Sequence, residues 1–214
     1  CADGALRMEA LPGGGSRTEL RADTTTMLDA ADALFGLAVS STPRSALLLF
    51  LNNTELRPGG GFLGTYGLAT VQHGALVDLR TDDVYRLDRT VEGTLRIPPP
   101  APFRTLGIVP YWYLRDANWS PDFAVSAAQV LNFYQREGGA GHPDIVIGFT
   151  PSLAAPLLRL VGPVRVGGTT FTAENVADAI DFEVEKGYYL RGIPEPQRKD
   201  IIAPLTRTVV DRLL

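Results

Sequence analysis

Residues 46–61 read ALLLFLNNTELRPGGG, and they contain the strongest strand signal of the chain together with an unusual loop. Its first six residues, Ala46–Leu51, form a continuous apolar run between Pro43 and two asparagines. Six residues are too few for a typical helix, and a short apolar run with such boundaries is typical of a strand buried on both faces. The remainder is a polar loop that ends in three consecutive glycines, Gly59–Gly61. The stretch therefore predicts a central buried strand followed by a glycine-rich loop.

A β-hairpin is expected directly after this loop. Residues 65–72 alternate between apolar and polar side chains, and residues 75–79 form a second strand pattern. The two residues between them, His73 and Gly74, suit a two-residue hairpin turn. Residues 90–110 contain a cluster of prolines, which predicts a stiff surface segment close to polyproline II.

The second half of the chain alternates helices with short strands. Ser120 is expected to cap the first helix, with Pro121 at its first position and Asp122 in its first turn. The expected elements are a helix at 122–137, a strand at 144–149, a helix at 151–161, a hairpin of 163–166 with 169–171, a helix at 173–180 capped by Thr172, and a helix at 195–214 that Pro204 kinks or interrupts. The buried face of the first helix is expected to consist of Phe123, Ala127, Val130, Leu131 and Tyr134.

Strands that alternate with helices over one hydrophobic core predict a single α/β domain with a mixed central β-sheet and helices packed on it. We assign residues 44–214 to this domain. Residues 1–43 are expected to comprise a loose glycine-rich segment at 1–18 and an amphipathic helix at 20–39.

The composition excludes several classes of protein. The 214 residues are 45% hydrophobic and 21% charged, which is too apolar for a disordered chain. The formal charge is −4 and Lys and Arg form no cluster, so we expect no nucleic-acid partner. No stretch reaches the roughly 18 apolar residues of a transmembrane helix. The single cysteine, Cys1, fits an acylated first residue of a bacterial lipoprotein or, as we favour, a chain that begins at an arbitrary residue.

The sequence lacks the standard catalytic constellations. It contains only two histidines, His73 and His142, which argues against a Ser-His-Asp enzyme and excludes a histidine-rich zinc site. The triple glycine is not followed by Gly-Lys-Ser/Thr, so it is not a P-loop.

Two segments suit an anionic ligand instead. Arg57 stands beside the bare backbone of Gly59 and Gly60, which combines a guanidinium with exposed N–H groups. Arg115 and Asn118 precede a helix start, a second feature that favours a phosphate or carboxylate. The alternative is that both arginines are used up in ion pairs with neighbouring carboxylates.

Carboxylates at the same helix start are candidates for metal binding and catalysis. Asp116 and Asp122 can supply oxygen ligands to Mg²⁺, and we name both as candidate catalytic residues. The charged run from Arg80 to Asp88 is expected to be a solvated strand end. Arg80 is kept as a candidate ligand-binding residue because the strand's exit can bring it near the other two segments.

The same segments resemble the two signature stretches of the bacterial domain-of-unknown-function family 4012. Residues 48–64 read LLFLNNTELRPGGGFLG and residues 114–123 read LRDANWSPDF. Residues 144–151, 162–164 and 172–176 provide supporting matches. The resemblance extends from about residue 44 to the C-terminus.

The order of elements is in turn similar to that of the LytR–CpsA–Psr family. Those membrane-anchored, extracytoplasmic proteins transfer glycopolymers from a polyprenyl-pyrophosphate carrier to peptidoglycan. The chain departs from their pattern at two places. Residues 60–64 replace an Arg–Asp pair at the start of the hairpin, and residues 80–83 replace a Pro-Arg-Asp after its second strand. The pyrophosphate-binding residues are therefore not carried over one for one.

This likeness implies an extracytoplasmic, cell-envelope protein that binds a pyrophosphate-linked lipid or glycopolymer, with a membrane anchor outside this chain. If it is a phosphotransferase, Arg57 and Arg115 would neutralise the pyrophosphate. Mg²⁺ on Asp116 or Asp122 would polarise it, and a second Asp would deprotonate the acceptor. An apolar groove would take the polyprenyl chain.

The alternative function is a non-catalytic envelope module that binds glycan or a partner protein. Its stacking surfaces would be Tyr111, Trp112, Tyr113 and Trp119. Convergence of Arg57, Arg115 and Asp122 on one pocket would favour the enzyme.

Overall fold

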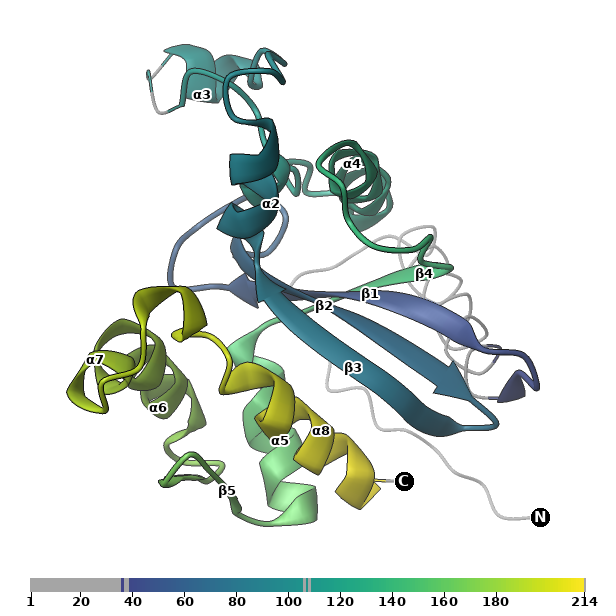
Figure 1. Ribbon diagram of the computed structural model, residues 1–214, viewed down its shortest axis with the longest axis vertical. Helices are drawn as coiled ribbons and strands as arrows, with labels where there is room; N and C mark the ends of the chain where they lie inside the picture. The colour runs from purple at the N-terminus through teal and green to yellow at the C-terminus, as the bar shows by residue number, and fades with distance from the viewer. Residues whose placement is uncertain (1–35, 37–38, 106, 108, 214) are drawn as a thin grey trace, which may run out of the picture. The chain divides into compact units, whose positions relative to one another are not determined.

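The computed structural model describes residue 36, residues 39–105, residue 107 and residues 109–213 (Figure 1). The residues described from 39 onward belong to one compact unit. The segment expected at 1–18 and the helix expected at 20–39 lie outside the described residues, apart from Gly36 and Val39. Within the described part of the chain, no helix combines the length and the apolar character needed to cross a bilayer.

A mixed four-stranded sheet forms the centre of this unit, in the order β3–β2–β1–β4. Strand β1 (Arg44–Asn52) pairs antiparallel with β2 (Phe62–Gln72) and parallel with β4 (Ile145–Phe149). Strand β3 (Ala75–Asp83) pairs antiparallel with β2 and closes the other edge. The expected α/β class and mixed sheet are thereby confirmed.

The hairpin of β2 and β3 is longer than its sequence pattern suggested. His73 and Gly74 form its turn with positive φ angles of 51° and 75°, as a primed two-residue turn requires. The ladder extends to a pair between Thr65 and Asp83. Residues 80–83 do end the strand and Arg80 is exposed as expected, but the interpretation as solvated is wrong for Asp83, which is buried.

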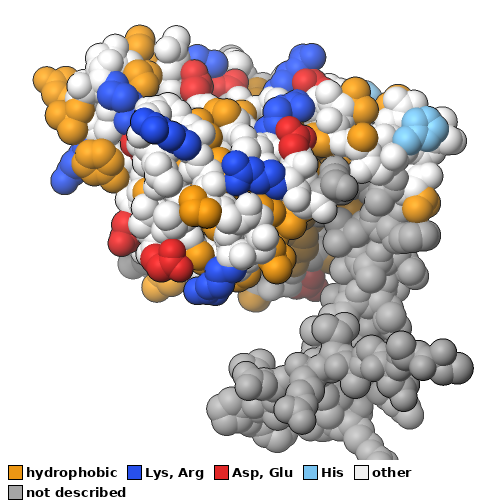
Figure 2. All heavy atoms as spheres, turned by 90° about the horizontal axis from the view of Figure 1, so that it is seen from below, with side chains coloured by type: hydrophobic (Ala, Val, Ile, Leu, Met, Phe, Trp, Pro, Cys, Tyr) orange, Lys and Arg blue, Asp and Glu red, His pale blue; other side chains and the backbone are white. Residues whose placement is uncertain are grey.

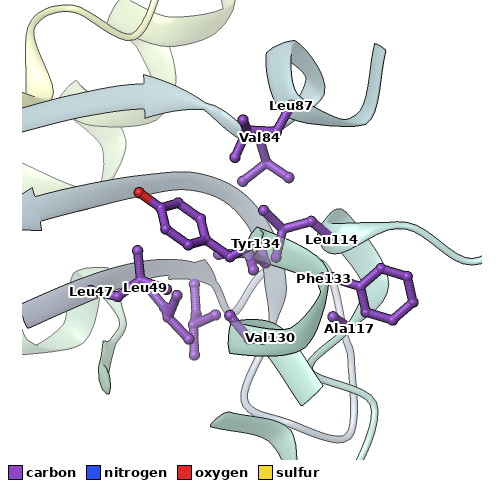
Figure 3. Packing of buried hydrophobic residues seen from close by; sticks show 11 residues of the cluster. Leu47, Leu49, Val84, Leu87, Leu114, Ala117, Val130, Phe133 and Tyr134 are labelled. Carbon is purple, nitrogen blue, oxygen red and sulfur yellow. The ribbon is translucent and has the colours of Figure 1, made fainter. Parts of the chain in front are cut away.

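Helices cover both faces of the sheet, with α4 (Phe123–Arg136) on one side and α5 (Pro151–Val161) and α8 (Ile202–Leu213) on the other (Figure 1). Alternate residues of β1 face the two layers, as the two-residue period of a strand dictates. Leu47 and Leu49 pack in the core that contains the α4 residues Val130, Phe133 and Tyr134 (Figure 3). Leu48 and Phe50 face the opposite side and line a cavity.

The second helical layer has a core of its own. It contains α5, α8, helix α6 (Val176–Phe182), and the hairpin of β5 (Val164–Val166) with β6 (Thr169–Phe171). The buried members of this core are Leu158, Val164, Phe171, Val176, Leu205 and Val209. The expected helix at 151–161 and the hairpin after it are confirmed in position.

The start of α4 differs from the prediction. Asp122, and not Ser120, is the N-cap, since its Oδ1 accepts hydrogen bonds from the N–H groups of Ala124 at 2.9 Å and Val125 at 3.4 Å. Ser120 instead accepts a hydrogen bond from the Asp122 N–H. Phe123, expected on the buried face, is 42% exposed because the buried face of α4 is centred on other residues. The buried residues of α4 are Ser126, Val130, Phe133 and Tyr134.

The segment expected to be polyproline-like contains helical turns. Helix α2 (Val84–Val91) was not expected, and a short helix α3 (Ala101–Thr105) follows the prolines. Pro102 lies in the first turn of α3, where no backbone N–H partner is needed. Phe103 is buried and packs against Trp119, and this contact anchors α3 to the rest of the domain.

The C-terminal helices are shorter and more numerous than predicted. The helix expected at 173–180 begins at Val176, after Asn175, and leads into a π-turn η2 (Glu183–Gly187) and a single turn α7 (Tyr188–Leu190). The helix expected at 195–214 divides into η3 (Glu195–Gln197) and α8. Pro204 causes no kink there because it is the third residue of α8, within the first turn.

Candidate functional site

A chain of ion pairs gathers around Asp116, in the short 3₁₀ turn η1 (Leu114–Asp116). The Arg57 Nε lies 3.2 Å from Asp116 Oδ1, and its Nη2 lies 3.0 Å from Glu55. The Arg115 Nε lies 3.6 Å from Asp116 Oδ2, and its Nη1 donates to Asp88 at 2.6 Å. The structure thus brings the two predicted arginines together on one carboxylate.

Aromatic rings surround both guanidinium groups. Arg57 lies over Phe62 and Phe103, at 5.1 and 5.7 Å from the ring centroids. Arg115 lies over Tyr85 and Tyr113, at 5.3 and 5.0 Å. Such rings attract a cation and exclude water from it. The arginines are therefore held rigidly, with only about one sixth of each side chain exposed (16% and 15%).

Two carboxylates that the sequence did not single out complete this network. Asp88 and Glu137 are fully buried, and one oxygen of each, Asp88 Oδ1 and Glu137 Oε2, has no hydrogen-bond partner among the described residues. The Leu114 N–H donates to Glu137 at 2.8 Å. Burial, followed by the nearby Asp88 charge, raises the pKa of Glu137 to about 8. Burial likewise raises the pKa of Asp88, and that of Asp116 against the opposing effect of Arg57.

The glycine-rich loop is packed against the segment that carries Asn118. A Cβ on Gly59 would lie 2.1 Å from the Asn118 carbonyl oxygen, and one on Gly61 would lie 2.4 Å from that of Asn52. Gly60 adopts a φ of 101°. The Asn118 side chain donates to the Gly61 carbonyl at 2.8 Å. These glycines are required for close approach of backbone segments, and Asn118 connects the loop to η1.

The remaining predicted residues lie outside the network. Arg80 is on β3 with 80% of its side chain exposed, and it pairs with Asp78. Asp122 is occupied as the N-cap of α4. Asp116 belongs to the network, but both of its oxygens are engaged by arginines. The described residues contain no group of three or more His, Cys, Asp and Glu side chains that could hold a metal ion.

A cavity of about 620 Å³ lies between the sheet and the second helical layer. Most of its lining is aliphatic or aromatic, including Leu48, Phe50, Phe149, Leu153, Ala154, Leu157, Ile180, Leu205 and Val209. Its basic lining residues are Arg198 and Lys199. The Lys199 Nζ lies 3.1 Å from Asp83 Oδ2 and donates to the Gly64 carbonyl at 2.6 Å.

The charged network and the cavity are adjacent. Glu55, Phe62 and Tyr85 line the cavity and also contact Arg57 or Arg115. Glu55 follows the end of β1, Phe62 pairs with Asn52 at that end, and Tyr85 follows the end of β3 in α2. The carboxyl ends of parallel strands such as β1 and β4 are where open α/β sheets usually bind ligands. The two features therefore form one candidate site with a charged part and an apolar part.

The comparisons with known proteins place this site within a family. No curated protein and no solved structure matches the chain. A family model does match it, over residues 41–184, which include the sheet, the glycine-rich loop and the whole charged network. The chain therefore belongs to the family described as protein of unknown function, DUF4012.

Proposed function

We propose that the protein binds a pyrophosphate-linked polyprenyl lipid, or the glycopolymer that such a lipid carries, in the extracytoplasmic cell envelope. The observation that carries this proposal is the cavity between the sheet and helices α5, α6 and α8. Its volume of about 620 Å³ is typical of small-molecule sites, which span about 300–1,000 Å³. An apolar pocket beside charged residues suits an amphiphile with a long hydrocarbon chain and an anionic head.

The charged network at Arg57 is one candidate for the headgroup contact, and an anion there would have to compete with its carboxylates. Three carboxylates, Glu55, Asp88 and Asp116, hold the two arginines, so an incoming anion must replace one of them. Glu55 can leave at the lowest cost because its side chain is 52% exposed and regains water on release. Asp88 and Asp116 are almost fully buried, and leaving them unpaired would cost far more.

Binding has more support than phosphotransfer. Asp116 already faces two arginines and Asp122 caps a helix, so neither carboxylate stands ready as a base or a metal ligand. A Mg²⁺ ion at this site would need phosphate oxygens of the ligand among its own ligands, as is common for Mg²⁺.

The alternative function, stacking of glycan on exposed aromatic side chains, has less support. Tyr113 is buried, and Trp112 donates to the Asp116 carbonyl and packs edge-on against Phe133. Trp119 packs against Phe103. These rings belong to the core beneath the network. On the face viewed from the side of α5 and α8, hydrophobic side chains are scattered among charged ones (Figure 2).

Calorimetric titration with farnesyl pyrophosphate, farnesol and inorganic pyrophosphate tests the proposal. Farnesyl pyrophosphate should bind to the wild-type protein, and Ala154→Trp, which fills the cavity, should weaken binding at least about tenfold. Leu160→Trp is the matched control, since Leu160 lies on the same helix but is 76% exposed. Equal affinity in both variants, or no binding of farnesyl pyrophosphate to the wild type, would refute the proposal.

A further inference from the structure

Lys199 differs from the other cations near the cavity in its position and in its partners. The residue is 9% exposed and lines the cavity, whereas Arg57 and Arg115 contact residues of the lining without lining it themselves. Its Nζ has two partners among the described residues, Asp83 and the Gly64 carbonyl. An ammonium group has three N–H donors, so one donor remains for a ligand.

The partner of Lys199 is itself fixed by the backbone. Asp83 is the N-cap of α2, and its Oδ1 accepts a hydrogen bond from the Tyr85 N–H at 3.0 Å. The cap holds the Asp83 carboxylate beside the helix start, where the helix dipole stabilises its charge. Asp83 and Gly64 therefore fix the position of Lys199. The Asp83 carboxylate neutralises the Lys199 charge only in part, because it also accepts a hydrogen bond from the first turn of α2.

Two further cations lie near Lys199 or its aromatic neighbour. The Tyr85 ring, whose centroid is 5.8 Å from the Nζ, lies near Arg115 as well, at 5.3 Å. Neighbouring Arg198 lines the same cavity and makes only long ion pairs, at 3.5 Å with Glu185 and 3.4 Å with Glu195. Both partners are mostly exposed, so Arg198 can turn toward a ligand at little cost. In an apolar cavity such charges act over a lower dielectric than in water.

We infer that Lys199, supported by Arg198, binds the acidic headgroup of the amphiphile whose chain occupies the cavity, and thereby selects anionic over uncharged lipids. This inference rests on the proposed function and assigns the headgroup contact to a residue outside the arginine network. Charge complementarity identifies the ligand class: a single-chain lipid with a phosphate or pyrophosphate head, and not its alcohol.

The test uses the double variant Lys199→Met with Asp83→Asn. This change removes both charges together, so no unpaired buried carboxylate remains, and Asn retains the capping oxygen. Affinity for farnesyl pyrophosphate should fall at least about tenfold, while affinity for farnesol should change less than about twofold. Lys186→Met is the matched control, since Lys186 is the chain's other lysine and is exposed. A thermal melt of each variant verifies folding.

The outcomes separate the inference from the proposed function. Equal losses for farnesyl pyrophosphate and farnesol would show that Lys199 acts through the shape of the cavity, which overturns the inference and leaves lipid binding intact. An unchanged affinity in the double variant with a loss in Arg57→Lys would place the headgroup at the arginine network and would also overturn it. Binding of neither lipid to the wild-type protein would refute the proposed function itself.

A second measurement observes Lys199 directly in the wild-type protein. Reductive ¹³C-methylation labels two lysine side chains and the amino terminus, so the Lys199 resonance can be assigned by its loss in the double variant. Farnesyl pyrophosphate should shift the Lys199 resonance and leave Lys186 unchanged. A shift that farnesol reproduces in full would contradict a contact with the headgroup.

Discussion

Several charged side chains of this site are buried, and burial disfavours an ionised group. Asp88, Asp116 and Glu137 are each less than about 3% exposed, and Arg115 is the cation that faces Asp88. Removing one partner of such a buried pair destabilises a protein by about 3–5 kcal/mol, because the other charge remains without compensation. Truncation of Arg57 or Arg115 to alanine would therefore confuse stability with binding, and variants that preserve charge or hydrogen bonding are more informative.

Glu137 offers such a variant and makes stability depend on pH. Its pKa is raised from 4.5 to about 8 in the folded protein, so between these values the folded state binds more protons than the unfolded state. Stability then falls as the pH rises, by at most about 1.4 kcal/mol per pH unit from this group. Asp88, whose pKa is also raised, adds to the same trend.

We expect Glu137→Gln to flatten this dependence, because Gln mimics the protonated acid and can still accept from the Leu114 N–H and donate to Asp88. Urea unfolding at a series of pH values from 5 to 9 measures the slope. Asp144→Asn serves as a control: the pKa of the Asp144 carboxyl is lowered by the Ser45 N–H and Arg44, so the group stays ionised from pH 5 to 9 and its replacement should leave the slope unchanged. Parallel profiles for wild type and Glu137→Gln would contradict the raised pKa of Glu137.

At the scale of single elements, local signals predicted most of the fold. Helix α5 was located correctly because Pro151 begins it and Gly162, with a φ of 79°, ends it. The four strands of the sheet follow from apolar runs and one turn. The buried charges could not be found in this way, because their partners are distant in sequence. Arg115 meets Asp88 across 27 residues, and Lys199 meets Gly64 across 135.

The sequence identified Arg57 and Arg115 correctly as neighbours, but it did not predict the residues that surround them. Sequence indicated a guanidinium beside a bare backbone at Gly59 and Gly60. The structure shows that this backbone packs on the Asn118 segment and leaves no room for a ligand at Gly59. Close approach of two backbones depends on tertiary packing, and a run of glycines is compatible with both interpretations.

The cap of α4 gives a prediction at this scale. Asp122→Ala should lower the free energy of unfolding by about 1 kcal/mol, since it removes the acceptor for the Ala124 and Val125 N–H groups. Asp122→Asn should have a much smaller effect, because Asn is an equally good cap. Chemical denaturation measures both. If Ser120→Ala lowered the free energy of unfolding more than Asp122→Ala, Ser120 would be the N-cap after all. If Asp122→Asn weakened lipid binding, Asp122 would have a role at the ligand site.

At the scale of the whole domain, the cavity exists because the two layers bury most of their apolar surface separately. One core joins the sheet to α4 and η1, and a second joins α5, α6, α8 and the β5–β6 hairpin. No sheet residue of β1–β4 belongs to the second core among the described residues. Lys199 connects the second layer to β2 and to the end of β3, and Asn53 donates a hydrogen bond to Ser152 of α5.

This arrangement predicts how a ligand changes the dynamics of the domain. A lipid in the cavity contacts both layers, so it should stabilise the second layer against local opening, by about 2.7 kcal/mol at a concentration of 100 times Kd. Hydrogen exchange measured by mass spectrometry should show slower exchange in α6 and α8 when farnesyl pyrophosphate is added, and no change at the His73–Gly74 turn. Inorganic pyrophosphate alone should not reproduce the effect, because it has no chain to connect the layers. Protection confined to α2 and η1 would instead locate the ligand on the arginine network and leave the cavity without a role in binding.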